Sequence, residues 1–552
     1  MPTRKVQWIL IGILLLWSLS YACLLIFLYP SSISLFEWMP LHTSQDSSSF
    51  QVFPPIFEVQ RDVSGITSQL VLISAFFDAR PVLFNKQPHI LIAAISRLGN
   101  ESMLSQAHCR FNYAQGSQQK AKLSFKVPNE HLNLLFHTTL IYCDLAESFS
   151  RARDACHFEQ MIPNQVAVFH DEFFQPLVFK NISVTRPMLS LLFTKRIDSL
   201  GNMHSSYARN TSNCFSSQAE KESPLSFWSP NSIAICTAPL RRDGYRDVVP
   251  HFLEYYRTMG VSKVYAYISP PLRKRFRDQL QYYEAQDFVE TIPWVLPRCK
   301  ELDNHTMHGS LLYCDYYTVF VHAFAQTAAI ADCIMRTAGQ SRWTLLLDYD
   351  EFLSPQHSND LLPRMLSRMF SNLNDSEIRS DQLAGAHFFT YMYSECGDLE
   401  KEYSRFSVNK SSSILISAFL SRYREKVPDG FGFRSKYLIS PLHIDEMGVH
   451  FPYHSFSDSG STALKEINLK WWKLFQRKNT RRKRSHPAIA FLKDQVVLVH
   501  PDFAHIHHIR FPQRFECQNK IFDDCQSSLQ NHSEQVVSRL RAGIFKSSFV
   551  AP

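Results

Sequence analysis

Glycine is scarce in this sequence. The chain has 16 glycines among 552 residues, about half the share usual for a globular protein. It contains neither a Walker-type nor a Rossmann glycine motif. A glycine-rich phosphate loop is therefore not expected, which argues against the nucleotide-binding classes that depend on one.

Two further absences narrow the possible functions. No two cysteines form a Cys-x-x-Cys pair, so a structural zinc site is not expected. A broad excess of basic residues is also lacking, because the net charge of +8 is modest for this length and comes mostly from local clusters. Nucleic acid is therefore not an expected partner.

The composition is that of a globular protein, with 45% hydrophobic and 20% charged residues. The length predicts two or more domains. Near the start, Arg4 and Lys5 precede an uncharged run at residues 6–28, long enough to cross a bilayer as a helix. The run ends in bulky residues rather than a small-residue cleavage site, which favours an uncleaved signal-anchor.

The positive-inside rule places residues 1–5 in the cytosol and everything after Leu28 in the lumen. We therefore expect a single-pass type II protein of the Golgi membrane, with a stem at 29–65. Removing Cys23 of the anchor from the twelve cysteines leaves eleven, most of which should pair in an oxidising compartment. Glycosylation acceptors agree with this address, at Asn100, Asn181, Asn210, Asn304, Asn374, Asn409 and Asn531.

Short β-branched runs separated by turn residues predict a β-rich accessory domain over 66–228, of the sandwich type. The predicted strands are 69–77, 90–95, 122–127, 138–142, 166–169 and 181–192. The pattern changes in the second half of the chain, 229–552. There a strand at 233–238, a helix at 249–259 stopped by Gly260 and a strand at 263–268 predict the start of a parallel α/β sheet.

An apolar run at 343–347 is followed at once by Asp348 and Asp350, the chain's only Asp-x-Asp. In an extended chain these two side chains point to the same side, while Tyr349 and Glu351 point to the other. Carboxylates at the end of a buried strand suit Mn²⁺ or Mg²⁺. The alternative is that one aspartate only caps the next helix.

Several blocks in this order resemble glycosyltransferase family 92, whose characterised members are largely β-1,4-galactosyltransferases. The similar blocks are 252–265, 326–333, 343–353, 435–441 with 448–450, and 507–510. The sequence departs from the family pattern at Ser269–Pro271, where the family usually has an aspartate, and at Ile509, where it usually has a tyrosine. The resemblance implies a GT-A-like α/β domain with a mixed, mostly parallel sheet, and a UDP-sugar donor such as UDP-galactose.

On this interpretation Asp348 and Asp350 hold Mn²⁺ or Mg²⁺ at the donor diphosphate, and His508 or His450 adds a ligand. An inverting enzyme also needs a carboxylate base, for which Glu395 is the first candidate and Asp398 the second. The expected donor contacts are Asp332, Gln326, Thr237 and Arg241. For each of these residues a purely structural role is the alternative, such as a polar side chain in a loop or a histidine packed at the edge of a strand.

Two other functions stay open. The same fold can use another UDP-sugar, and a fold without activity could bind glycans at a membrane. The acceptor is expected to be a glycan on a glycoprotein, and the oligomeric state is left open. The basic run Arg481–Arg484 is either a solvated loop or a furin-type cleavage site.

Overall fold

The computed structural model describes residues 70–78, 80, 89–97, 101–128, 136–145, 162–170, 182–185, 232–240, 248–269, 272, 274–294, 322–355, 361–371, 383–394, 423–425, 435–450, 452–455, 489–491, 496–501, 503–509 and 522–524. The chain divides into two compact units, Met1–Pro55 and Ile56–Pro552. The described residues all belong to the second. The predicted membrane helix at 6–28, the stem at 29–65 and the Arg481–Arg484 run lie outside them.

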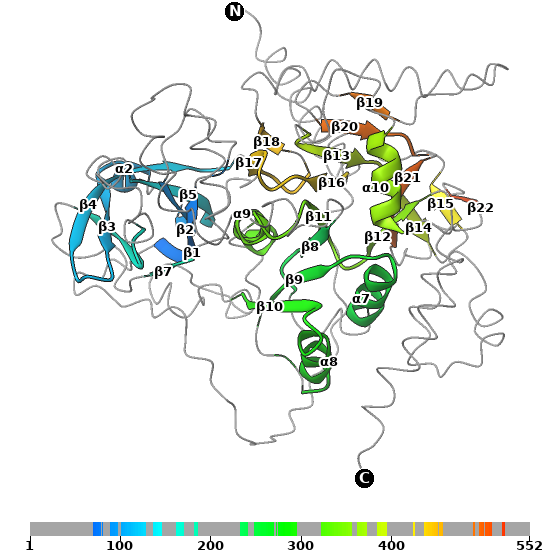
Figure 1. Cartoon of the computed structure of the whole chain (residues 1–552), viewed down its shortest axis with the longest axis horizontal. Coiled ribbons are helices and arrows are strands. Elements are labelled where there is room, and N and C mark those ends of the chain that lie inside the picture. The colour runs from blue at the N-terminus through cyan, green and yellow to red at the C-terminus, as the bar shows by residue number, and fades with distance from the viewer. Residues whose placement is uncertain are drawn as a thin grey trace, which may run out of the picture. The chain divides into compact units, whose positions relative to one another are not determined.

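The accessory domain, drawn in blue and cyan in Figure 1, is a closed barrel. Its strands follow the order β1-β2-β5-β4-β3-β6-β7. Its elements are β1 (Leu70–Asp78), β2 (His89–Arg97), α2 (Glu101–Ser105), β3 (Ala107–Asn112), β4 (Gln118–Lys126), β5 (Phe136–Asp144), β6 (Gln165–His170) and β7 (Ile182–Thr185). Strand β7 closes the barrel by pairing in parallel with β1 at Ala75. The barrel has its own apolar core, which includes Leu72, Ile92 and Phe111.

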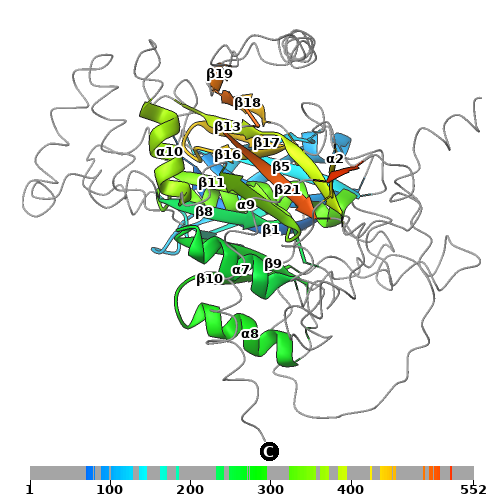
Figure 2. The same cartoon turned by 90° about the vertical axis from the view of Figure 1, so that its right-hand side faces the viewer.

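The second half of the chain is built on an eight-stranded sheet of order β10-β9-β8-β11-β16-β13-β20-β19 (Figure 2). The strands are β8 (Ile233–Thr237), β9 (Lys263–Ile268), β10 (Val289–Pro293), β11 (Trp343–Leu347), β13 (Gly385–Phe388), β16 (Lys436–Ile439), β19 (Ile489–Phe491) and β20 (Val496–Val499). The first four in the order run parallel to one another, whereas β16 runs antiparallel to β11.

Side chains alternate between the two faces of this sheet. Ile233, Ile235 and Leu345 join one core with helices α7 (Val249–Thr258), α8 (Lys274–Glu284) and α10 (Leu362–Ser371). Ala234 and Leu346 join the opposite core with helix α9 (Gln326–Thr337), which follows the short helix η7 (His322–Ala325). A disulfide between Cys236 of β8 and Cys333 of α9 fixes this helix to the sheet.

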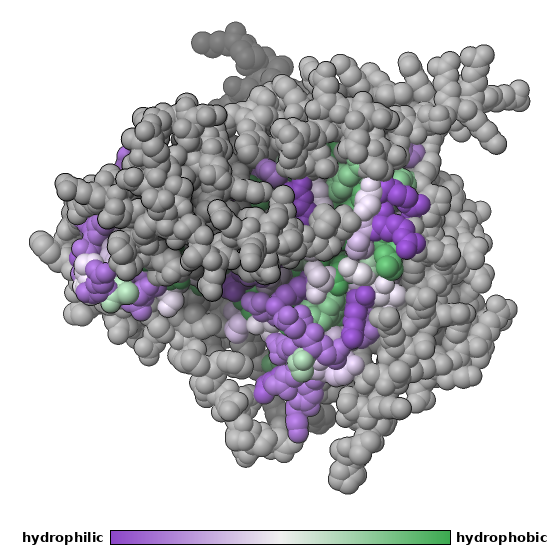
Figure 3. Space-filling model, in the orientation of Figure 1, coloured by the Kyte–Doolittle hydropathy of each residue, from purple (hydrophilic) through white to green (hydrophobic). Residues whose placement is uncertain are grey.

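A second, five-stranded sheet has the order β12-β21-β14-β15-β22. Its strands are β12 (Glu351–Pro355), β14 (Thr390–Ser394), β15 (Tyr423–Glu425), β21 (Ala504–Ile509) and β22 (Phe522–Asp524). A hairpin of β17 (Ile444–Met447) and β18 (Pro452–Ser455) follows β16. On the face shown in Figure 3, hydrophilic residues gather over α8 and α10, as expected for helices that cover a sheet.

The predicted fold class is wrong. The described residues are rich in strands and contain few helices, so they do not form the mostly parallel GT-A-like α/β domain that was expected. Within the described part of the chain no helix is long and apolar enough to cross a membrane. The accessory domain is a barrel rather than a sandwich. The expectation rested on the family resemblance and on the strand–helix–strand pattern at 233–268. The hydrophobic pattern of a strand does not encode the direction of its partner, so the pattern could not test that expectation for the rest of the domain.

The barrel is joined to the segment after β16 by a buried arginine. Arg80 pairs with Asp78, with 2.8 Å between Nη2 and Oδ2. Its Nη1 donates to the backbone oxygens of Pro441 at 3.1 Å and Ile444 at 2.7 Å. Arg80 and Asp78 are 2% and 0% exposed, so the contact is shielded from water.

We predict that Arg80→Ala lowers the free energy of unfolding by about 3–5 kcal/mol, because the buried Asp78 carboxylate loses its closest cationic partner and keeps the longer 3.6 Å contact with His89. Lys263→Ala is the control, since Lys263 pairs with Asp287 and Glu290, which are 88% and 38% exposed, and its loss should cost at most about 1 kcal/mol. Urea denaturation measures both. Equal losses in the two variants would contradict the role of Arg80.

A second prediction concerns His387 of β13, whose pKa is lowered by burial to about 3. In the unfolded chain the imidazole of His387 takes up a proton near pH 6.5, whereas in the folded chain it stays neutral. Above pH 6.5 this group therefore does not reduce the free energy of unfolding. As the pH falls from 6.5 towards 3, the free energy of unfolding decreases by about 1.4 kcal/mol per pH unit.

His387→Phe keeps a ring against Phe389 and Tyr437 and removes the titration. Urea denaturation between pH 7.5 and 4 should therefore show a shallower pH dependence for the variant. An unchanged slope would show that His387 does not control it.

Candidate functional site

The two aspartates of the Asp-x-Asp lie in the turn where the chain passes from one sheet to the other. Strand β11 of the eight-stranded sheet ends at Leu347, and β12 of the five-stranded sheet begins at Glu351. Tyr349 anchors this turn: its ring is buried against Phe252 of α7, and its hydroxyl accepts a hydrogen bond from Thr237. The flanking Asp348 and Asp350 keep 35% and 25% of their side chains exposed.

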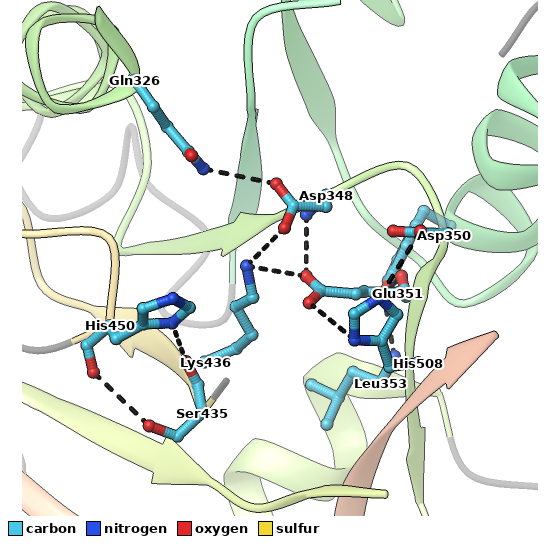
Figure 4. Close-up of polar contacts among 10 residues, drawn as sticks. Gln326, Asp348, Asp350, Glu351, Leu353, Ser435, Lys436, His450 and His508 are labelled. Carbon is cyan, nitrogen blue, oxygen red and sulfur yellow. Dashed lines mark hydrogen bonds and ion pairs between the residues drawn. The ribbon is translucent and has the colours of Figure 1, made fainter. Parts of the chain in front are cut away.

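A lysine from a neighbouring strand lies beside the turn. Lys436 begins β16, and its Nζ is 2.8 Å from Oδ2 of Asp348 and 3.0 Å from Oε2 of Glu351 (Figure 4). Only 2% of its side chain is exposed. The same Glu351 oxygen accepts a hydrogen bond from the backbone N–H of Asp348 at 2.8 Å. The ammonium group therefore ties together the two ends of the turn.

The cluster continues to the five-stranded sheet. Glu351 is opposite His508 in the pairing of β12 with β21. His508 Nε2 is 3.5 Å from Oδ2 of Asp350, and its Nδ1 is 3.8 Å from Oε1 of Glu351. Acidic groups thus alternate with basic ones from Asp348 through Lys436, Glu351 and His508 to Asp350, as Figure 4 shows.

These neighbours shift the acid–base properties of the cluster. Burial raises the pKa of Asp348, but the ammonium of Lys436 outweighs it and leaves the pKa below its usual value. Burial raises the pKa of Glu351 to about 7; Lys436 opposes this and the Asp348 carboxylate reinforces it. Burial alone would lower the pKa of His508. The carboxylates of Asp350 and, after it, Glu351 outweigh burial and raise this pKa to about 9.

Glu351 lies on the same side as the aspartates, contrary to the expectation that it points away from them. The expectation assumed one extended strand from Trp343 to Leu353. The chain instead turns at 348–350, and the turn breaks the alternation before β12 begins. The carboxylate of Glu351 is 1% exposed and contacts both Lys436 and the Asp348 backbone.

The structure brings two more of the predicted residues to this cluster. Gln326 begins α9, and its amide donates to Oδ1 of Asp348 at 3.3 Å. His450 lies near enough to Asp348 to lower the pKa of that carboxyl, and its Nδ1 is 3.4 Å from the backbone oxygen of Ser435. Both residues approach the turn from elements other than β11 and β12.

Thr237 and Asp332 have other partners. The hydroxyl of Thr237 lies on the buried side of the turn, where it donates to Tyr349 at 2.8 Å. Asp332 is buried in α9, where it pairs with Arg336 at 2.6 Å and accepts a hydrogen bond from Tyr267. Their predicted donor contacts stay predictions. Arg241, Glu395 and Asp398 lie outside the described residues.

The cluster has the right donors for Mn²⁺ or Mg²⁺, namely carboxylates and an imidazole. Among the described residues, however, no three histidine, cysteine, aspartate or glutamate side chains converge to hold a metal ion by themselves. Ions that bind nucleotides commonly use one or two carboxylates and complete their shell with phosphate oxygens and water. Asp348 and Asp350, partly exposed, fit a cation held in that way.

Sequence reasoning assigned no role to Lys436. The signal available was a lysine directly before the apolar Tyr437–Ile439, within a block that was used only for the family resemblance. It also missed two tyrosines of α7 that cover the outer edge of β12. Tyr256 donates to the backbone oxygen of Glu351 at 3.0 Å and accepts from the N–H of Leu353 at 2.8 Å, while Tyr255 donates to the Leu353 oxygen.

Comparison with known proteins identifies a family. The model described as glycosyltransferase family 92 matches residues 231–543, more than half of the 552 residues. Beta-1,4-galactosyltransferase galt-1 of Caenorhabditis elegans is 25% identical over 142 residues, which are 25% of this chain and 29% of the relative. The chain therefore aligns with less than a third of that relative's length.

A solved structure described as "Crystal Structure of a Mycobacterial Protein" aligns with 59% of this chain and 79% of its own, at 9% identity and a TM-score of 0.21. A likeness at this level carries no argument about the fold or the function.

We predict that Tyr256→Phe lowers the free energy of unfolding by about 1–3 kcal/mol, because it leaves the Leu353 N–H and the Glu351 oxygen without their buried partner. Tyr255→Phe is the matched control on the same helix, and it removes the hydrogen bond to the Leu353 oxygen. Chemical denaturation should rank Tyr256→Phe as the more damaging change. The reverse order would contradict the role given to Tyr256.

Proposed function

Since the chain belongs to glycosyltransferase family 92, we propose that it transfers a sugar from a nucleoside diphosphate donor to a glycan acceptor. The observation that carries the proposal is the cluster of charged side chains at the turn between the two sheets. There Asp348 and Asp350 are partly exposed, while Lys436 and Glu351 are buried beneath them.

Each side chain has a task in this proposal. Asp348 and Asp350 hold a divalent cation, Mn²⁺ or Mg²⁺, with His508 or His450 as a further donor. The cation supplies positive charge where the diphosphate leaves. Gln326 orients the Asp348 carboxylate through its amide. Lys436 adds a fixed positive charge at the same edge, which favours an anionic donor group.

Inversion at the sugar carbon requires a base for the acceptor hydroxyl. Glu395 is the first candidate for this base and Asp398 the second. Both follow β14, whose described part ends at Ser394. Their assignment is supported by their place directly after this strand and by the need for a carboxylate.

For the donor we propose UDP-galactose and a β linkage. The support is the match to a relative named beta-1,4-galactosyltransferase galt-1. Choice among UDP-sugars depends on the shape of the pocket around the sugar, so other UDP-sugars are the first alternative. A glycan-binding protein without activity is the second.

We predict that the purified full chain, supplied with Mn²⁺ and a panel of glycan acceptors, releases UDP from UDP-galactose faster than from other UDP-sugars. The double variant Asp348→Ala, Asp350→Ala should lower kcat/KM by at least about 10²-fold, because it removes the charges that hold the cation at the leaving group. Asp287→Ala is the control, since this aspartate is 88% exposed in a surface ion pair with Lys263.

The panel separates the alternatives. Preference for another UDP-sugar would support glycosyltransferase activity and contradict galactose as the transferred sugar. No UDP release with any donor, together with measurable glycan binding, would contradict the proposed activity. Full activity of the double variant would show that Asp348 and Asp350 are not the cation site.

A further inference from the structure

Lys436 occupies the position between Asp348 and Glu351 where a cation would neutralise both carboxylates. Its Nζ is within 3.0 Å of an oxygen from each. The described part of the chain has a second lysine with two carboxylate partners, Lys263, but it lies at the surface and meets the exposed Asp287 and Glu290.

Both oxygens of the Asp348 carboxylate already face a donor. Oδ2 pairs with Lys436 at 2.8 Å, and Oδ1 accepts from the amide of Gln326 at 3.3 Å. A divalent cation that approaches alone must therefore compete with a donor hydrogen or lie close to the ammonium. Like charges a few ångströms apart and away from bulk water repel strongly. A divalent cation without a nucleotide is therefore expected to bind weakly beside Asp348 and Lys436.

A nucleoside diphosphate changes the balance. Its oxygens bring negative charge to the same edge and supply ligands that the cluster lacks, since the described residues hold no three-ligand site of their own. The ammonium of Lys436 then faces an anion as well as a cation. Buried Glu351 keeps the ammonium at the turn, because their ion pair involves no oxygen of Asp348.

We propose that Lys436 makes divalent-cation binding at Asp348 and Asp350 depend on the donor diphosphate, so that the cation binds together with the nucleotide. The inference rests on the proposed function and adds the order in which that site fills. Lys436 is a positioning residue in this scheme, because it acts through Asp348 and Glu351.

The test measures binding of Mn²⁺ to the purified full chain by the loss of the electron paramagnetic resonance signal of free Mn²⁺, with and without UDP. In the wild-type chain, UDP should tighten Mn²⁺ binding by about tenfold or more, and Mn²⁺ should tighten UDP binding by the same factor. In Lys436→Met, Mn²⁺ alone should bind about tenfold more tightly than to the wild type, because the repelling charge is gone. The effect of UDP should shrink accordingly.

Two variants serve as controls. Lys436→Arg keeps the charge and should retain the dependence on UDP. Lys263→Met removes a surface lysine that bridges two carboxylates and should leave Mn²⁺ binding unchanged. Thermal melting identifies a variant that is unfolded. Should Lys436→Met unfold, the wild type still decides the question, since Mn²⁺ binding that is equally tight with and without UDP contradicts the inference.

The failure of this inference differs from the failure of the proposed function. Unchanged coupling between Mn²⁺ and UDP in a folded Lys436→Met variant overturns the role of Lys436, while sugar transfer by the wild-type chain leaves the function standing. A wild-type chain that neither transfers sugar nor binds UDP overturns both.

Discussion

The ion pairs of Lys436 with Asp348 and Glu351 are the constraint on which the site depends. Three side chains from β16, the β11–β12 turn and β12 meet where one sheet gives way to the other. Removing a lysine from water is costly, and the cost is offset here by two carboxylates and by a turn that presents them together. These ion pairs also stabilise the conformation of residues 348–350 that leaves Asp348 and Asp350 accessible.

The surrounding architecture keeps this arrangement rigid. Helix α9 is attached to β8 by a disulfide and carries Gln326 to the turn. Helix α7 packs Phe252 against Tyr349 and supplies the two tyrosine hydroxyls on β12. On the other side, the barrel reaches the segment after β16 through Arg80. Lys436 thus lies on a strand whose far end is attached to a separate domain.

The sequence predicted single elements well and their assembly poorly. The strand at Lys263–Ile268 and the end of α7 near Gly260 were confirmed, since periodicity and a glycine with φ of 85° are local properties. The fold class was wrong, because the direction of β16 relative to β11 depends on contacts about 90 residues apart in sequence. Lys436 was missed for the same reason: a charge beside an apolar run shows no partner until the strands are paired. Glu351 was expected on the opposite side from the aspartates, because the turn at 348–350 that breaks the strand alternation was not foreseen.

The tyrosines of α7 have a consequence beyond the site. Strand β12 stands at the edge of its sheet, and exposed edge strands invite pairing with a second chain, which leads to swapped dimers or fibrils. Here hydroxyl groups bind the outward N–H of Leu353 and the outward oxygens of Glu351 and Leu353. The helix that supports the charged cluster thereby also protects that edge from self-association.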